Sequence, residues 1–512
     1  MLEKLSIMET QMIKNKYEYL KTKICIIGSG IGGGTIIQKL AEQNKEFIII
    51  EAGEWSGDSE NVSYENVGLD FGVRSTTTVQ IGGTSNLWHG VLAPLDKIDF
   101  EKRDWIPKSG WAVSLEELEP YYKKASEVLQ VEKYEYFEKD GLSDELNTQL
   151  DNLVCNREYL KNKLFQQAVP HVNFKDVVKK ICEDSDKQHL YYNTTALELI
   201  KENGKITKLK VGNSDGTFSY LEAEQFIVCS GALETPRLLL NSHIENKNIG
   251  KYLMDHPMGN LCQLEFLNPF KYPIYSDTKY NSNMKIKTGL ELTDEKQKEL
   301  KLPNHNFYLR PSFIKGIDDE SEKIKLSLLA FKDGGVSVKD VWKVLTNLNV
   351  IRQIVAYKFS LDVTFKYADL FFVTEQIPNE NSYVGLSQQK DKWGYRKSLV
   401  NWQISDEDIQ SMKVWFELLL TELFPKEHYK FTHTLEDFNW KEILTSAIHH
   451  VGTCRMGHDK NEGVVDKNLK IFGVDNLYVC DGSIFTTAGN VNNGLTISAF
   501  ACRLAEYLGN DR

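Results

Sequence analysis

Two segments near the end of the chain carry side chains that could act together in catalysis. A double histidine, His449 and His450, begins the stretch HHVGTCRMG, and an asparagine pair, Asn492 and Asn493, follows it. Histidine suits proton transfer at neutral pH because its ordinary pKa is about 6.5. An asparagine amide can donate a hydrogen bond to an oxygen on which negative charge develops. The pattern therefore predicts a general base with a polar partner.

A glycine-rich turn near the start of the chain could bind a dinucleotide. Residues 28–33 read GSGIGG; an apolar run at 23–27 precedes them and a helical pattern follows, continuing to about residue 43. A second apolar run at 47–50 ends at Glu51. Continuous apolar runs of this kind are typical of parallel strands buried on both faces. The segment therefore predicts a strand–helix–strand unit.

Each glycine of this turn has its own physical role in such a unit. Gly28 permits the tight turn, Gly30 lets the backbone approach a pyrophosphate, and Gly33 lets helix and strand pack closely. The start of the helix offers N–H groups and a positive dipole end to phosphates, and Glu51 is placed to accept hydrogen bonds from a ribose. Oxidising an alcohol removes a hydride from carbon and a proton from oxygen. A bound dinucleotide that can take the hydride, together with a side chain that can take the proton, therefore indicates this reaction.

The remaining pattern divides the chain into two interwoven parts. The first has expected helices at 118–129, at 496–508 and after residue 231, and expected buried strands at 225–230 and 476–480. The second shows the alternation of apolar and polar residues that antiparallel strands with one wet face require. These strands are expected at 306–314, 324–331, 369–375, 382–387 and 398–404.

We therefore expect an α/β fold (α+β overall) with a Rossmann-like nucleotide-binding domain interwoven with an antiparallel-sheet substrate domain. The nucleotide-binding domain takes residues 20–262, and the substrate domain takes residues 263–430. Residues 431–512 return to the first domain and carry the histidine and asparagine pairs.

The composition argues against several partner classes. The net charge of the 512 residues is −11, and binding nucleic acid requires a basic surface that neutralises phosphates. A membrane span needs about 18 apolar residues. The nearest approach, residues 341–359, is interrupted by charged and amide side chains and predicts an amphipathic helix packed on the protein.

The cysteines and the first residues of the chain bear on the compartment. Eight cysteines are present without any C-x-x-C spacing, and several stand in apolar strand-like runs, which indicates buried reduced thiols. The N-terminus shows no apolar run of a secretory signal. A cytoplasmic location is therefore expected. No metal site is expected, because two adjacent histidines do not converge on one ion.

Several short segments occur in the order seen in the glucose-methanol-choline oxidoreductase family. These segments are residues 28–33, 79–90, 231–237, 253–257, 449–457 and 476–508. The resemblance covers the first 130 residues or so, a block near 190–260 and the last 70, and it is weaker in the substrate domain apart from residues 375–384. No single segment is decisive, but the ordered set is specific to this family.

The resemblance implies FAD as the cofactor. Gly28, Gly30, Gly33 and Glu51 match the residues that hold the AMP half of FAD. Gly82, Gly83, Thr84 and Ser85 match the segment beside the flavin, and Asp481 and Gly482 match the segment at the ribityl-pyrophosphate. Leu87 stands where family members with covalent flavin have histidine, with His89 two positions later. Dissociable FAD is therefore expected.

The resemblance also assigns the catalytic pair. His449 matches the base of the family pattern His-x-x-Gly-Thr, and Asn492 matches its polar partner. His450 would point to the opposite side of an extended segment. Asn493 stands where many relatives have proline, which leaves the choice between Asn492 and Asn493 open. Asparagine at this point also suits the start of a helix.

The implied function is FAD-dependent oxidation of an alcohol to an aldehyde or ketone. A sugar, cyclitol or aminoglycoside-like polyol is the expected substrate, and the electron acceptor stays open between dioxygen, a quinone and a carrier protein. A lyase that keeps FAD on the same scaffold is one alternative, and a non-catalytic flavoprotein is another. Retention of both His449 and Asn492 speaks against a pure binding protein.

Overall fold

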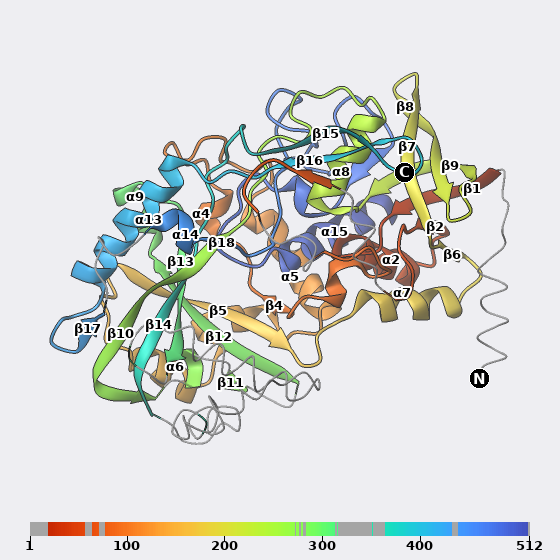
Figure 1. Ribbon diagram of the computed structural model, residues 1–512. Coiled ribbons are helices and arrows are strands. Elements are labelled where there is room, and N and C mark those ends of the chain that lie inside the picture. The colour runs from red at the N-terminus through yellow and green to blue at the C-terminus, as the bar shows by residue number, and fades with distance from the viewer. Residues whose placement is uncertain are drawn as a thin grey trace, which may run out of the picture.

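The computed structural model places two sheets side by side in one body (Figure 1). It describes residues 19–56, 64–70, 77–271, 273–275, 278–279, 283–312, 315, 351, 364–432 and 439–509. The expected strand at 324–331 and the expected amphipathic helix at 341–359 lie outside these residues.

The first sheet is mixed, with a parallel centre. Its strands, in order across the sheet, are β6 (Gln188–Tyr191), β2 (Phe47–Ile50), β1 (Tyr19–Ile27), β9 (Phe218–Val228), β8 (Lys205–Asn213) and β7 (Thr194–Glu202), with β19 (Leu477–Val479) also on β9. Pairing is parallel from β6 to β9 and between β9 and β19, whereas β7, β8 and β9 form an antiparallel meander.

The parallel strands form where the sequence offers short apolar runs. All four residues of β2 are buried, because helices cover a parallel sheet on its faces and leave no wet side. The helix α2 (Ile31–Glu42) follows the glycine turn after β1. It packs against the closing helix α15 (Gly494–Gly509), and the Thr35 and Ser498 hydroxyls meet at 3.1 Å in the interface.

The second sheet is antiparallel. Its strands, in order, are β17 (Tyr429–Phe431), β10 (Pro257–Lys271), β14 (Thr364–Val373), β13 (Asn306–Ser312), β12 (Met284–Leu292), β5 (Leu160–Ala168) and β4 (Val91–Leu92), with β11 (Thr278–Lys279) on β12 and β18 (Thr445–Ser446) on β10. Its apolar face forms a second core with helix α13 (Asp406–Leu418), whose Trp415 ring lies 5.1 Å from that of Phe307.

The structure also contains a third, small sheet, and the sequence pattern had placed two of its strands in the substrate domain. It contains β15 (Tyr383–Lys390), β16 (Arg396–Asn401) and β3 (Tyr64–Asn66). Val384 and Val400 of this sheet pack on Leu233 of helix α8 (Gly231–Asn241). The two strands expected in the substrate domain therefore join the nucleotide-binding side, because a buried apolar patch on α8 is available there.

The other helices and short turns connect these sheets. They are α4 (Lys97–Phe100), α5 (Leu115–Val128), α6 (Asp144–Asp151), α7 (Phe174–Glu183), α9 (Asp294–Leu300) and α14 (Trp440–Ile443), with the single turns η2 (Gly83–Asn86), η3 (Tyr134–Phe137), η4 (Lys139–Gly141), η5 (Pro273–Tyr275), η6 (Leu419–Leu423) and η8 (Gly482–Ile484). None of the helices in the described residues has the length and apolarity to span a membrane.

The predicted α/β architecture is confirmed, with a Rossmann-like sheet beside an antiparallel one. Strands β4, β5 and β18 show that the antiparallel sheet also takes chain from outside residues 263–430. The division at 262/263 and 430/431 stays a prediction. All eight cysteines lie in the described residues, and each is unpaired.

Candidate active site

The predicted histidine and asparagine meet in the structure although they are far apart in sequence. The side-chain Nδ2 of Asn492 lies 2.9 Å from Nε2 of His449. Asn492 stands just before α15, and His449 follows β18. Both side chains keep partial exposure to solvent. Of the two candidate asparagines, the structure therefore places Asn492 on His449, while the Asn493 amide lies near Gly482.

A second histidine, His256, lies on the other side of His449. The two Nδ1 atoms are 2.9 Å apart, and the rings meet nearly edge to face at 5.1 Å and 74°. Nε2 of His256 lies 3.1 Å from the carbonyl oxygen of Ala488. His256 is fully buried, at 0% exposure, immediately before β10. Both nitrogens of His449 thus face a polar group.

Asp255 shapes the turn that presents His449. Its Oδ1 accepts hydrogen bonds from the backbone N–H groups of His256 at 2.6 Å and His449 at 2.9 Å. Its Oδ2 accepts from the Ser446 hydroxyl and from the Ile448 N–H at 3.2 Å. Ile448 has φ of 62°, a left-handed conformation that is rare for a β-branched residue. The buried carboxylate compensates strain directly before the candidate base.

The electrostatic surroundings keep the histidines neutral. Burial is the largest cause that lowers the pKa of His449 well below its usual value; nearby His256 lowers it further, and Asp255 acts in the opposite direction. Burial likewise lowers the pKa values of His256 and His450, against Asp255. Nε2 of His450 lies 3.7 Å from Asp255 Oδ2. At neutral pH these imidazoles can therefore accept a proton.

The glycine turn has the shape that a dinucleotide requires. Gly28 has φ of 96°, and a side chain there would come within 2.6 Å of the Cys229 carbonyl oxygen. A Cβ placed on Gly30 would meet no atom within 4 Å, and no side chain caps the helix at this residue. Gly33 lies in the first turn of α2 against Gly28. Open space therefore faces an uncapped helix start, which fits the pyrophosphate of FAD.

Glu51 joins the glycine turn to the segment expected beside the flavin. Its Oε2 accepts from the Ser29 N–H at 3.0 Å and the Ser29 hydroxyl at 2.6 Å, and its Oε1 accepts from the Gly53 N–H at 3.0 Å. The Ser29 hydroxyl in turn accepts from the Gly82 N–H at 2.9 Å. Burial raises the pKa of Glu51. A carboxylate at the end of β2 still has lone pairs for a ribose.

The other expected cofactor residues also gather at this end of the parallel sheet. Gly83 lies against Gly30, and the buried Ser85 hydroxyl donates to the Gly82 carbonyl at 2.6 Å, while Thr84 is exposed. Asp481 accepts from the Gly231 N–H at 2.9 Å and the Thr235 hydroxyl at 2.6 Å, and Gly482 follows it against the His450 carbonyl. Asp481 thus fixes the start of α8 to β19.

Sequence reasoning gave no role to three of the residues that organise this site. Asp255, His256 and Ser29 were present in the quoted segments, but most of their partners are far away in sequence: Gly82 is 53 residues from Ser29, and Ala488 is 232 residues from His256. An adjacent Asp–His pair at the start of an apolar strand was the available signal, since buried charged residues need partners. The partners themselves come only from the fold.

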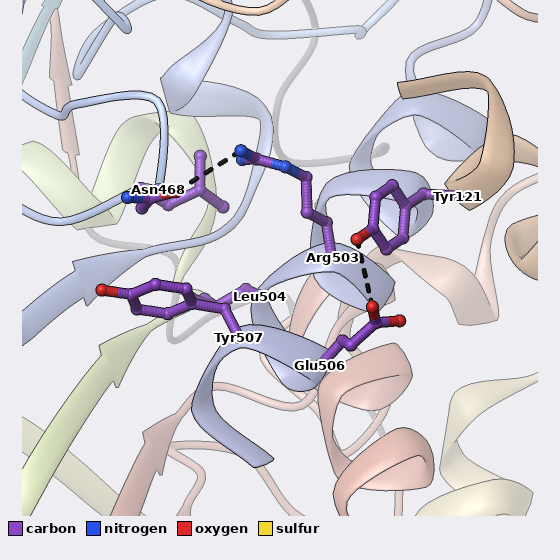
Figure 2. Close-up of a pocket in the computed structure, with 7 residues that line it drawn as sticks. Tyr121, Asn468, Arg503, Leu504, Glu506 and Tyr507 are labelled. Carbon is purple, nitrogen blue, oxygen red and sulfur yellow. Dashed lines mark hydrogen bonds between the residues drawn. The ribbon is translucent and has the colours of Figure 1, made fainter. Parts of the chain in front are cut away.

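A cavity elsewhere on the molecule is separate from this site. Figure 2 shows it at the far end of α15, with a volume of about 190 Å³. Tyr121, Arg503, Glu506 and Tyr507 line it, whereas Asn492 lies before the other end of that helix. Tyr121 donates to Glu506 at 3.3 Å. This cavity contains none of the predicted site residues.

The fold and the glycine turn are those expected of a dinucleotide-binding protein. The pattern described as GMC oxidoreductase matches residues 81–258 with its N-terminal part and residues 378–501 with its C-terminal part. These two stretches make up more than half of the chain. The chain therefore belongs to the glucose-methanol-choline (GMC) oxidoreductase family, and it is an FAD-dependent enzyme, as the resemblance implied.

Individual relatives act on varied alcohols. A 2-methyl-1,2-propanediol dehydrogenase of Mycolicibacterium austroafricanum is 23% identical over 95% of both chains. A 6'''-hydroxyparomomycin C oxidase of Streptomyces lividus is 43% identical over a short stretch, 13% of each chain. The crystal structure of pyridoxine 4-oxidase from Mesorbium loti has a TM-score of 0.61 and 16% identity, covering 96% of this chain and 100% of that one. The last comparison supports the fold alone.

Proposed function

We propose that this enzyme oxidises an alcohol CH–OH group to an aldehyde or ketone, with His449 as the general base and Asn492 as its partner. The observation that carries the proposal is the 2.9 Å contact between His449 Nε2 and Asn492 Nδ2. It brings a proton acceptor and an amide donor together beside the end of the sheet where FAD would be held. A binding protein would need neither side chain.

The proton and the hydride leave the substrate separately. The substrate hydroxyl takes the place of the Asn492 amide at His449 Nε2, because Nε2 has a single lone pair. Nε2 then takes the hydroxyl proton, while the released amide N–H of Asn492 donates to the same oxygen as negative charge grows on it. FAD, when bound, accepts the hydride with its two electrons. The carbon–oxygen double bond forms as the O–H and C–H bonds break. Partial exposure of both side chains gives the hydroxyl access to them.

Gly28, Gly30, Gly33 and Glu51 would hold the AMP half of FAD, and the two segments at residues 82–85 and 481–482 would hold the rest of the cofactor. We expect the cofactor to be dissociable. Leu87, at the position of the covalent attachment, has no nucleophilic atom and is 47% exposed. His89 is exposed, and its carbonyl accepts a hydrogen bond from the Gln167 amide at 2.7 Å.

The preferred substrate class is a polyol: a sugar, a cyclitol or an aminoglycoside-like compound. Similarity to a diol dehydrogenase and to an aminoglycoside-type oxidase supports this choice. Dioxygen, a quinone or a carrier protein can then reoxidise the flavin. Eight unpaired cysteines support a reducing compartment such as the cytoplasm.

The test is a visible absorbance spectrum of the purified protein, recorded before and after anaerobic addition of polyols and simple alcohols. We expect an oxidised flavin spectrum that is bleached by at least one polyol. Dithionite serves as the control that the flavin can be reduced. Flavin that stays oxidised with every alcohol while dithionite bleaches it would favour the lyase or the non-catalytic flavoprotein. Bleaching by simple alcohols alone would overturn the polyol assignment.

A further inference from the structure

We propose that His256 is a positioning residue that determines which nitrogen of His449 carries the proton. The observation is an unbroken series of side-chain contacts from a backbone carbonyl, through both imidazoles, to Asn492. The inference rests on the proposed function for its catalytic consequence, but the proton positions themselves follow from the hydrogen-bond geometry and from the neutrality of both rings.

The series begins at a group that can only accept. The Ala488 carbonyl oxygen has no hydrogen, so Nε2 of His256, 3.1 Å away, must be the donor. Burial lowers the pKa of His256, which keeps the ring neutral. A neutral imidazole carries one N–H. Nδ1 of His256 is therefore an acceptor.

The same reasoning assigns the proton of His449 to its Nδ1. Its Nδ1 lies 2.9 Å from the bare Nδ1 of His256 and must donate to it. Because His449 is also neutral, its Nε2 is bare, and it accepts the amide hydrogen of Asn492 at 2.9 Å. Nε2 is the atom that the proposed reaction uses as base. The Ala488 carbonyl thus selects the reactive form of a ring that it does not touch.

The surroundings hold His256 in the geometry that this selection needs. Its side chain is fully buried, and its backbone N–H donates to Asp255, the same carboxylate that accepts from the backbone of His449. A rotation of the ring by half a turn would leave the Ala488 carbonyl facing carbon, which costs a buried hydrogen bond. One orientation is therefore strongly preferred.

His256 is a neutral partner, where the Ser-His-Asp triad has a carboxylate. When His449 gains a proton, its Nδ1–H keeps the bond to His256, which is itself uncharged. The charged or titratable groups that face this pair are Asp255, His450 and, toward His256, Glu375. A neutral partner keeps His449 a weaker base and unprotonated at neutral pH.

Nuclear magnetic resonance of the holoenzyme labelled with ¹⁵N-histidine tests the assignment. The signals of His449 are identified by their loss in His449→Gln. We expect wild-type His449 to show a protonated Nδ1 and a bare Nε2. In His256→Phe, which keeps ring volume but removes both nitrogens, only the Asn492 amide still favours the wild-type form, so the tautomer with a protonated Nε2 should become measurably populated. In His256→Gln, whose amide offers one donor and one acceptor, the wild-type form should largely return.

His305→Phe is the matched control, because His305 is also a buried histidine, and its ring bonds to Ser411 at 3.0 Å and to no member of the series. It should leave the His449 signals unchanged. Flavin reduction in His256→Phe should be slower by at least about tenfold with a shifted acid limb of its pH profile, and His256→Gln should recover part of the rate.

A protonated Nε2 on wild-type His449, or an unchanged tautomer in His256→Phe, would overturn the proposal. If His256→Phe does not fold, the wild-type and His256→Gln spectra still decide it. Loss of the tautomer preference without any loss of flavin reduction would leave His256 as the tautomer-setting residue, and it would count against His449 as the base.

Discussion

Asn492 has two amide hydrogens, and the structure directs one of them to His449. We propose that the substrate hydroxyl displaces this hydrogen from His449, and that the Asn492 amide then donates to the substrate oxygen. Asn493 is adjacent but lies near Gly482, and its carbonyl accepts the Ile497 N–H at 3.0 Å in the first turn of α15. The two asparagines therefore have separable roles.

Replacing Asn492 by alanine should slow flavin reduction by about 100-fold, the scale of losing one oxyanion donor. The matched variant Asn493→Ala should change the rate much less, because its contacts are structural. Rapid-mixing anaerobic kinetics with a substrate that bleaches the flavin measures both. A slow Asn493→Ala beside a nearly normal Asn492→Ala would reverse the assignment.

Individual residue types predicted part of the site and not the rest. His449 and Asn492 could be identified because their chemistry and their motifs coincide. His256 could not, since its importance depends on the orientation of a ring between Ala488 and His449, and these contacts span 232 and 193 residues. A neutral histidine that acts through hydrogen bonds has no distinctive spacing in a sequence.

At the scale of the elements, the side chain of Ser29 connects three segments: the glycine turn, the end of β2 and the segment at 82–85. Ser29 donates to Glu51 and accepts from Gly82, which ties the glycine turn to both the ribose-side carboxylate and the segment at 82–85. Helix α2 stacks on α15 behind this turn. The proposed cofactor-binding turn is thus held by hydrogen bonds to Glu51 at the end of β2 and to Gly82 in a distant loop.

Replacing Ser29 by alanine should weaken FAD retention while the protein stays folded, because only two side-chain hydrogen bonds are lost. Glu51→Ala should weaken it further, since it removes the ribose-side carboxylate as well. The ratio of flavin to protein absorbance after dialysis measures retention. Thr22→Ala is a suitable control, because Thr22 lies on the same strand β1 and its side-chain hydroxyl bonds within that strand, at 3.4 Å to the Ile24 carbonyl. Full occupancy in Glu51→Ala would contradict the ribose assignment.

The ranges of helices and strands were predictable where the pattern of buried residues lies within the element's own sequence. The strand β2 coincides with its predicted range, and α2 ends one residue before its expected end near residue 43. Strands β15 and β16 formed near their expected ranges but in a different sheet. Alternation of apolar residues shows that a strand has one buried face, but it does not show that the covering surface is α8.

At the scale of the whole molecule, the antiparallel sheet holds the loop that carries Asn492. Asn490 donates to Glu291 of β12 at 2.6 Å and to Asn304 at 2.8 Å. Asn304 donates in turn to Asp99 at 3.1 Å, and its backbone N–H donates to Glu375 at 2.7 Å. His256 precedes a strand of the same sheet. The geometry of the proposed catalytic pair is therefore set between the two parts of the fold.

This buried network contains carboxyl groups that should make stability depend on pH. Burial is the largest cause that raises the pKa of Asp99 to about 8, with repulsion from Glu375 and Asp96 in addition. The folded protein then holds a proton that the unfolded chain releases above its ordinary pKa of about 4. The free energy of unfolding therefore falls as pH rises from roughly 4 to 8, by at most about 1.4 kcal/mol per pH unit for this group.

The range from pH 7 to 8 avoids the histidines, whose lowered pKa values place their protonation mainly below about 6.5. It still includes Glu291, whose pKa burial raises to about 7, so the comparison with Asp99→Asn is what assigns the effect to Asp99. Asp99→Asn should reduce the fall in melting temperature between pH 7 and 8, since the amide has no proton to lose. Asp140→Asn, an exposed carboxyl, is the matched control. Thermal unfolding at the two pH values decides, and an equal fall in wild type and Asp99→Asn would show that Asp99 is ionised in the fold.

The most direct measurement is the rate constant of anaerobic flavin reduction in His449→Ala. We expect this variant to keep its FAD spectrum but to be reduced at least about 100-fold more slowly than wild type, because the base that takes the hydroxyl proton is gone. His450→Ala, the adjacent histidine, should be reduced within a few-fold of the wild-type rate. A near-normal rate in His449→Ala would contradict the assignment of the base, and a slow His450→Ala beside it would move the role to His450.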